Sequence, residues 1–501
     1  MDPLDAARRY FAERSVPAWL VGGRVRDALL GRTSLDSDVV VGRDAAAHAR
    51  ALARRTGGSF VLLDPRRGYA RVVWSGDAET VLDITDIQGD GLEADLMARD
   101  FTVNALAVRL GVALPPDRSQ VIDPTGGLLD LAAGRLRATS PAAFDADPLR
   151  LLRGVRLAAT LGLALDPATR EAMTSRAPLA AQPAGERVRE ELARMLATGA
   201  PGDAVAELGR LGLLEVVLPA TLPGLEVAAE ALSALSAWRS TAGERGDGQV
   251  GAWLDDDAHG VADVGGAADV ERLSAAPPPA ISRHGAAIAA REPRPAVGGH
   301  GADVWTNLAL LLAAGALAAP ARSPRPARRV RAAVDAAALR LRLGIAETGR
   351  VYATARLAVG LCAPSAHDRS TRRAVYRAFR LGGECAAEAA IVAVALAWAA
   401  ERLHARTAPF ETSSGAASAR PLDAVQMDAG AWLDAWFWHR AERIDPPMLL
   451  DGRALMAALD LAPGPIVGRL LAGLREAQAL GEVVTVRDAE AWAKARLAAY
   501  G

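Results

Sequence analysis

The chain has 501 residues, of which 51% are hydrophobic and only 4% aromatic, and its formal net charge is -1. This length exceeds the usual size of one hydrophobic core, so several domains are expected. The near-zero charge excludes an overall basic field, so any contact with nucleic acid has to come from local groups of arginine.

Cysteine usage and hydropathy indicate the compartment. Cys362 and Cys385 are the two cysteines, and neither has a metal-ligand spacing, which argues against a disulfide scaffold or a structural zinc. Apolar runs such as residues 308–317 are too short to span a bilayer. We therefore expect a cytoplasmic protein without membrane contact, of unknown oligomeric state.

The chain changes texture along its length. Short β-type runs alternate with helical ones over residues 17–137, which predicts a compact α/β domain. From about residue 147 the pattern becomes helical, and helical blocks resume after residue 303. Residues 241–303 are rich in Gly, Pro and Ala and have no sustained period, which predicts a disordered insertion or linker. The predicted strands are 18–23, 37–42, 59–64, 70–74, 80–85 and 103–108.

The first motif is LVGGRVRDALLG, residues 20–31, in which an apolar strand meets two glycines and then a helix. The helix N-terminus behind Gly22 and Gly23 offers unpaired N–H groups to a phosphate, and glycine permits close approach of the backbone. Arg26 would add a charge-assisted contact. A strand–Gly–Gly–helix turn is structural in most proteins, so this motif alone is weak.

The second motif is LDSDVVV, residues 35–41. Asp36 and Asp38 are two residues apart on a strand, so their side chains leave the same face and can share metal ions. Two Mg²⁺ ions about 3.5 to 4 Å apart can activate an attacking hydroxyl and stabilise a leaving pyrophosphate. Such a pair is more often a solvated strand edge, but here the strand continues into two apolar valines.

A third carboxylate is available in VLDIT, residues 81–85. Asp83 lies inside an apolar strand, where an unpaired charge would be costly, and a nearby metal would remove that cost. The alternatives are that Asp83 faces water and that Asp86 is the third carboxylate.

Two further motifs carry arginines. ARDFTVNALAV, residues 98–108, places Arg99 where it can contact a triphosphate. DPLRLLRGVR, residues 147–156, places Asp147 before a helix that Pro148 can begin, and its arginines form a polar stripe. Those arginines are Arg150, Arg153 and Arg156. The plainer interpretation is a capped helix with a solvated basic face.

In this order and spacing, the motifs resemble the bacterial tRNA nucleotidyltransferase and poly(A) polymerase family of the polymerase-β-like superfamily. The two strand motifs look like its catalytic head, DPLRLLRGVR like its nucleotide-reading helix and GERVREELARML like its neck. The resemblance extends over residues 15–200. It implies an α/β nucleotidyltransferase head with a mixed sheet, followed by an all-α neck, body and tail. The implied domains are 1–137 (catalytic head), 138–240 (neck and nucleotide-reading region), 241–303 (insertion) and 304–501 (body and tail that bind tRNA).

The resemblance also implies roles for individual residues. Asp36 and Asp38 match the metal-binding pair, with Asp83 as the third carboxylate. Asp147 and Arg150 match the pair that reads the Watson–Crick edge of the incoming base, where a carboxylate accepts from the amino group that C and A share. The matches to nucleotide contacts are Gly23, Arg26, Arg99, Arg153 and Arg156, and Gly22 joins them through the glycine turn.

The implied function is template-independent addition of C and/or A from CTP and ATP to the 3′ end of tRNA, with Mg²⁺ as cofactor. Poly(A) polymerase activity is the nearest alternative, and a non-catalytic RNA-binding protein is a further one. Two departures from the family pattern matter. Ala146 stands where the reading helix usually has Glu, and residues 85–99 are shorter than in members with a flexible loop associated with the switch from C to A addition. A restricted CC-adding or A-adding activity therefore stays open.

Overall fold

The computed structural model describes residues 3–33, 37–75, 80–243, 302–318, 326–363, 369–407 and 420–499. The chain forms two compact units. The first is Met1–Glu191 with Leu211–Val216, and the second is Leu192–Arg210 with Val217–Gly501. The insertion predicted for residues 241–303 lies almost entirely outside the described residues.

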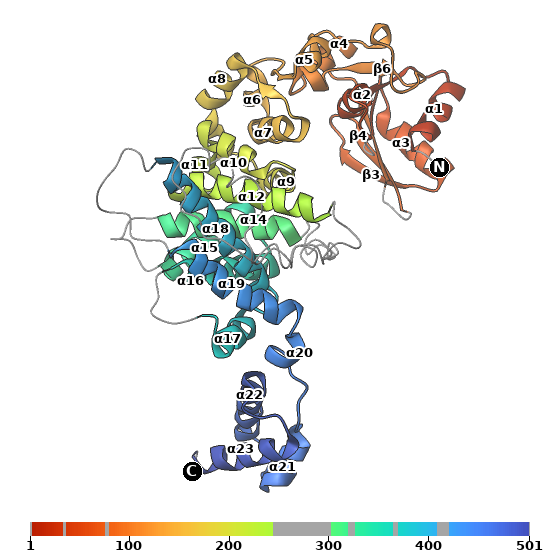
Figure 1. Ribbon diagram of the computed structural model, residues 1–501. Coiled ribbons are helices and arrows are strands. Elements are labelled where there is room, and N and C mark those ends of the chain that lie inside the picture. Colours follow the sequence, from red (N-terminus) through yellow and green to blue (C-terminus); the bar gives the residue numbers. More distant parts are fainter. Residues whose placement is uncertain are drawn as a thin grey trace. The chain divides into compact units, whose positions relative to one another are not determined.

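The first unit is built on a six-stranded mixed sheet of order β3-β4-β5-β2-β1-β6. Figure 1 labels β3, β4 and β6 of this sheet. Strands β2 and β5 run parallel, and the other neighbouring pairs are antiparallel. The strands are β1 (Ala18–Val21), β2 (Ser37–Val41), β3 (Ser59–Asp64), β4 (Tyr69–Trp74), β5 (Thr80–Asp86) and β6 (Ala107–Arg109).

One face of this sheet carries the larger core. Helices α1 (Pro3–Glu13) and α3 (Ala45–Thr56) pack on it with their apolar sides. Because strand side chains alternate between faces, every second residue of the strands joins this core. On β2, β4 and β5 these residues are Val39, Val41, Ala70, Val72, Leu82 and Ile84.

The opposite face is divided. Over β1, β6 and the C-terminal end of β2 it carries a small second core, which includes Val21, Ala107 and Val40 and is covered by Leu96 of α4 (Leu92–Met97). Its β2–β5–β4 half carries polar side chains instead. Because side chains alternate between the two faces of each strand, the polar residues of these strands lie together on the face opposite the larger core.

The rest of the first unit is mainly helical. It contains the short parallel pair β7 (Arg135–Leu136) and β8 (Ala164–Leu165). Its helices are α2 (Gly23–Leu29), α5 (Gly127–Ala132), α6 (Ala142–Ala146), α7 (Leu149–Leu161), α8 (Pro167–Ser175) and the first part of α9 (Gly185–Leu196).

The second unit is helical throughout its described residues, and its core is rich in alanine. Small side chains permit close approach of backbones. A β-carbon added to Gly315 would lie 2.1 Å from the carbonyl oxygen of Ala220, which is too close for any other residue. Its main helices are α10 (Pro201–Arg210), α12 (Leu225–Gly243), α14 (Ala302–Ala318), α15 (Pro326–Leu341), α16 (Ile345–Cys362), α17 (Arg372–Gly382), α18 (Cys385–Thr407) and α19 (Leu422–Phe437).

The C-terminal helices have a core of their own. It is formed by Leu455, Leu470 and Leu474 with their neighbours. The last helices are α20 (Arg440–Arg443), α21 (Gly452–Leu459), α22 (Pro465–Leu480) and α23 (Val486–Ala498), and α11 (Leu213–Val217) lies at the border of the two units. In the described ranges no single helix is long and apolar enough to cross a bilayer, and α17 with α18 passes that test only as a pair bent by 112°.

The predicted α/β head with a mixed sheet and the helical remainder are both confirmed. One predicted strand is shorter than expected. Residues 103–108 begin as a 3₁₀ turn, Thr102–Asn104, and β6 begins only at Ala107. The reason is local, because the Asp100 carboxylate accepts hydrogen bonds from the Phe101 N–H and the Asn104 amide and closes the turn.

Candidate active site

Two carboxylates lie side by side on the polar half of the sheet. Asp38 of β2 and Asp83 of β5 are register partners in the parallel pair, so their side chains leave the same face. Asp38 is exposed, whereas Asp83 is only 8% exposed. Carboxylate oxygens are the donors that Mg²⁺ prefers, so this pair fits a divalent cation. In the described part of the chain, no cluster of three or more His, Cys, Asp or Glu is arranged around a metal position.

The other two acidic candidates have different places. Asp36 lies outside the described residues, so its role stays a prediction. Asp86 is three residues from Asp83 and accepts a hydrogen bond from the N–H of Ala45, at the start of α3, at 2.8 Å. Its carboxylate is therefore occupied at a helix end, away from Asp83.

Asp83 is held by two residues of β4. The Arg71 guanidinium donates from Nε to Oδ1 at 2.7 Å and from Nη2 to Oδ2 at 2.9 Å, and the Tyr69 hydroxyl donates to Oδ2 at 2.6 Å. Burial and the Asp83 hydrogen bond raise the pKa of Tyr69, and the charge of Asp38 adds to this effect. The hydrogen bond to Asp83 likewise raises the pKa of Arg71. Asp83 thus accepts three hydrogen bonds from β4, beside the exposed Asp38.

The glycine turn lies next to these carboxylates. Gly22 has φ 73° and precedes α2. A β-carbon added to it would lie 3.1 Å from the Arg99 guanidinium and 3.5 Å from the Asp38 carboxylate. Glycine is required here by backbone conformation and by space. The turn therefore brings Gly22, Asp38 and Arg99 together.

Arg99 has an incompletely satisfied guanidinium. Its Nη2 donates to Asp95 at 3.3 Å, whereas its Nε is buried and has no hydrogen-bond partner among the residues that the structure describes. A buried donor without a partner is costly and suits a site that takes an anion.

Arg26 is only 7% exposed and is occupied within the protein. Its guanidinium donates to Asp27 at 2.9 and 2.7 Å and also to the side chain of Asn104. Gly23 lies against it, since an added β-carbon would be 3.4 Å from its Nη2. The predicted phosphate contact of Arg26 stays a prediction, and the observed contacts hold α2 against the 3₁₀ turn.

The predicted base-reading pair lies at the start of α7. Asp147 accepts from the N–H of Leu149 at 3.2 Å and pairs with Arg187 at 3.0 Å. Arg150 donates to the carbonyl oxygens of Arg99 and Ala143 at 3.4 and 3.3 Å. Burial lowers the pKa of Arg150, although nearby carboxylates oppose this. Arg150 thus places this helix start beside the residue 99 backbone.

The remaining two arginines of α7, Arg153 and Arg156, contact α9, the predicted neck helix. Arg156 and Arg153 both donate to Glu191 of α9, at 2.6 and 3.2 Å, and Arg153 also lies 3.5 Å from Asp100. Glu191 is 4% exposed. Their predicted nucleotide contacts stay a prediction, because these side chains are engaged in this ion-pair cluster.

Sequence reasoning missed three residues, Tyr69, Arg71 and Glu191. The first two had a usable signal, because in YARVVW the residues Tyr69 and Arg71 alternate with core-facing Ala70 and Val72. Glu191 stands in a helix rich in charges and had no comparable signal.

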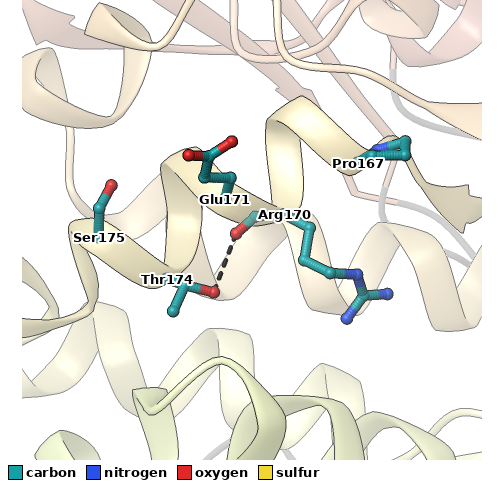
Figure 2. Close-up of a pocket in the computed structure, with 5 residues that line it drawn as sticks. All are labelled: Pro167, Arg170, Glu171, Thr174 and Ser175. Carbon is teal, nitrogen blue, oxygen red and sulfur yellow. Dashed lines mark hydrogen bonds between the residues drawn. The ribbon is translucent and has the colours of Figure 1, made fainter.

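A shallow depression lies away from these residues. It lies along α8 and is lined by Pro167, Arg170, Glu171, Thr174 and Ser175. Figure 2 shows these side chains on one helix, where the Thr174 hydroxyl donates to the Arg170 carbonyl oxygen at 3.0 Å. It contains no residue of the carboxylate cluster.

Residues 18–137 match the family described as "Poly A polymerase head domain", and residues 162–225 match "Probable RNA and SrmB- binding site of polymerase A". A CC-adding tRNA nucleotidyltransferase of Geobacter sulfurreducens is 50% identical over 179 residues, 36% of this chain and 40% of the relative. The chain thus spans less than half of that relative's length, and 41% of a Synechocystis relative of the same name.

One relative matches along nearly the whole chain. The A-adding tRNA nucleotidyltransferase of Deinococcus radiodurans is 32% identical over 497 residues, 95% of this chain and 94% of the relative. Among solved structures, an apo CCA-adding enzyme has a TM-score of 0.60 at 17% identity and covers 98% of this chain and 93% of its own. The Thermotoga maritima CCA-adding enzyme in complex with tRNA has a TM-score of 0.58 at 18% identity, covering 99% and 96%. These two structures share the fold. The chain belongs to the tRNA nucleotidyltransferase and poly(A) polymerase family.

Proposed function

We propose that this protein adds nucleotides to the 3′ end of tRNA without a template, and that its main activity is the addition of C from CTP. The observation that carries the proposal is the pair Asp38 and Asp83 beside the glycine turn, in a chain that is 32% identical to a tRNA nucleotidyltransferase over 95% of its length. The 3′ oxygen of the RNA bonds to the α-phosphorus as the bond to pyrophosphate breaks.

The carboxylates form the reaction centre in this proposal. Divalent cations, Mg²⁺ in our assignment, would be held by Asp38 and Asp83 with Asp36, and would supply charge stabilisation for the attacking hydroxyl and the leaving pyrophosphate. Asp38 is the accessible member and faces the triphosphate. Asp83 is the buried member, with its orientation fixed by β4.

The triphosphate is assigned to the glycine turn. Gly23 places its backbone N–H at the start of α2. Gly22 contributes space, because it has no side chain, while its own N–H donates to the Leu106 carbonyl oxygen at 3.0 Å. The buried Nε of Arg99, which has no partner in the described residues, supports a contact from Arg99 to a phosphate oxygen. Arg26 stabilises the turn by donating hydrogen bonds to the side chains of Asp27 and Asn104.

The incoming base is assigned to Asp147 and Arg150. Both lie at the start of α7, and Arg150 reaches the backbone of Arg99. A carboxylate that accepts from an exocyclic amino group selects C and A over U and G. Arg153 and Arg156 support this helix through Glu191, and a nucleotide contact by them is a further assignment.

Two features of the catalytic head support the choice of C addition. The connection between β5 and α4 is only residues 87–91, which leaves no room for the longer loop associated with the switch to A. The head also matches a CC-adding enzyme at 50% identity. Addition of A is the second candidate, because the relative that matches over the whole chain is an A-adding enzyme.

The decisive experiment uses three tRNA transcripts, which end before the first C, after CC and after CCA. Each is incubated with CTP, ATP, or both, and products are resolved to single nucleotides. We expect two C residues on the first transcript and no extension of the last. A single A on the CC transcript would favour the A-adding candidate, long A tracts would indicate a poly(A) polymerase, and no extension of any transcript would contradict catalysis.

The cytoplasmic location and the assignment of residues 304–501 to tRNA binding also belong to this proposal.

A further inference from the structure

The hydrogen bonds from Arg71 and Tyr69 to Asp83, here called the clasp, determine how that carboxylate can act. A carboxylate has about four acceptor sites, two on each oxygen. Arg71 and Tyr69 occupy both sites of Oδ2 and one of Oδ1. In the part of the chain that the structure describes, one acceptor site of Oδ1 therefore takes no hydrogen bond.

We propose that Arg71, assisted by Tyr69, is a positioning residue for nucleotidyl transfer, which fixes Asp83 with a single open acceptor site beside Asp38 and offsets part of the carboxylate charge. This inference rests on the proposed function. It adds a role for β4, which the assignment of the carboxylates alone does not require.

The clasp is better suited to fixing the orientation of the Asp83 carboxylate than to stabilising the fold. The Arg71 side chain is 38% exposed, and partly exposed ion pairs add little to the free energy of unfolding. A two-pronged guanidinium contact instead fixes the plane of the carboxylate, which a lysine cannot do. Arg71 and Asp83 are also register partners in the antiparallel β4–β5 pair, so the contact is built into the sheet.

The charge of Arg71 gives the proposal a distinctive signature. Arg71 neutralises one of the two neighbouring carboxylates, so its removal should increase the attraction of the pair for a cation. The same removal frees Asp83 to rotate and should slow catalysis. Metal affinity and turnover should then change in opposite directions, whereas a purely structural defect would lower both.

The test compares Arg71→Gln, Arg71→Lys and Tyr69→Phe with the wild type in the full-length protein. Arg55→Gln is the matched control, because Arg55 makes a similar two-pronged pair with Glu13, at 2.5 and 2.8 Å, on the α1–α3 side of the head. Mn²⁺ binding is measured by electron paramagnetic resonance without nucleotide. Steady-state kcat and KM for CTP are measured on tRNA, and circular dichroism checks the fold.

For Arg71→Gln we expect kcat to fall about 10-fold or more, KM for CTP to stay within about threefold, and Mn²⁺ to bind about threefold more tightly. Arg71→Lys, which keeps the charge, should lower kcat with Mn²⁺ affinity unchanged. Tyr69→Phe should lower kcat less than Arg71→Gln, and Arg55→Gln should change neither quantity.

An unchanged kcat in folded Arg71→Gln, or a lower kcat together with weaker Mn²⁺ binding, would overturn the inference. If Arg71→Gln does not fold, Arg71→Lys decides by the same measures, since wild-type kcat in that variant contradicts positioning. If the wild type extends no RNA, the proposed function fails. The Mn²⁺ measurements then still test the charge effect of Arg71 by themselves.

Discussion

Asp38 and Asp83 are register partners on adjacent parallel strands, yet one is exposed and the other is clasped by Arg71 and Tyr69. This asymmetry separates two roles that a pair of like carboxylates would otherwise share. Asp38 is exposed at the surface of the site, and Asp83 keeps one orientation.

Replacement of Asp38 should abolish catalysis and preserve the fold. Asp38→Asn keeps the shape of the side chain and removes a charge that lies outside the hydrophobic core, so nucleotide addition should fall about 100-fold or more with little change in Tm. Single-turnover extension of tRNA and thermal unfolding measure the two effects. Asp44→Asn is the control, because Asp44 is an exposed residue just beyond β2 that makes no helix-capping hydrogen bond. Substantial turnover in Asp38→Asn would contradict the assignment.

The glycine turn permits a comparison of two alanine substitutions. Gly22 and Gly31 have similar positive φ values of 73° and 68°, but only Gly22 has neighbours within 4 Å of an added β-carbon. Both Gly22→Ala and Gly31→Ala should lower stability through backbone strain, and Gly22→Ala by more, because its φ of 73° with ψ of -138° is a conformation that glycine alone adopts readily. Only Gly22→Ala should also raise KM for the nucleotide, because its methyl group presses on Arg99. Equal KM values in the two variants would contradict a binding role for this turn.

Base selection should depend on Asp147. A buried polar group left without a partner costs about 1 to 3 kcal/mol, so loss of the carboxylate should lower kcat/KM for CTP by about 10-fold and relax the rejection of UTP. Asp147→Ala also breaks the pair with Arg187. Arg187→Gln therefore serves as the control for that loss alone. If both variants show the same lowered Tm and wild-type selectivity, Asp147 has only a structural role.

Stability should decline in alkaline solution because of Cys362. Burial raises the pKa of this thiol from 9.0 to about 12. The unfolded chain therefore releases the proton from about pH 9 while the folded protein keeps it, so the free energy of unfolding falls as pH rises from 9 to 12. Cys362→Ala should reduce this decline, measured by urea unfolding at several pH values. An identical pH dependence in the variant would contradict the effect.

Much of the head was predictable because its signals are local. The β-type runs located five strands, and among them the two that carry Asp38 and Asp83. The partners of these residues were not predictable in the same way. The contact of Arg71 with Asp83 depends on which strand lies beside β5 and in which register, and neither is written in the pattern of one strand.

The same limit applies to the helices. Periodicity placed Arg150, Arg153 and Arg156 on one stripe of a helix, but it could not show that two of them bind Glu191 on another helix. Local chemistry also changed one expectation. The turn closed by Asp100 shortened the last strand, although its sequence has the alternation of a strand.

The contact between Arg150 and residue 99 has a consequence for engineering. Arg150 and the Thr139 hydroxyl both donate to the carbonyl oxygen of Arg99, so they bind its main chain and not its guanidinium. Any amino acid at position 99 retains that oxygen. A library that varies the side chain at 99 can therefore alter the proposed contact with phosphate, while α7 keeps its hydrogen bond to the residue 99 carbonyl oxygen. A second library at 147 can then be selected for new bases independently.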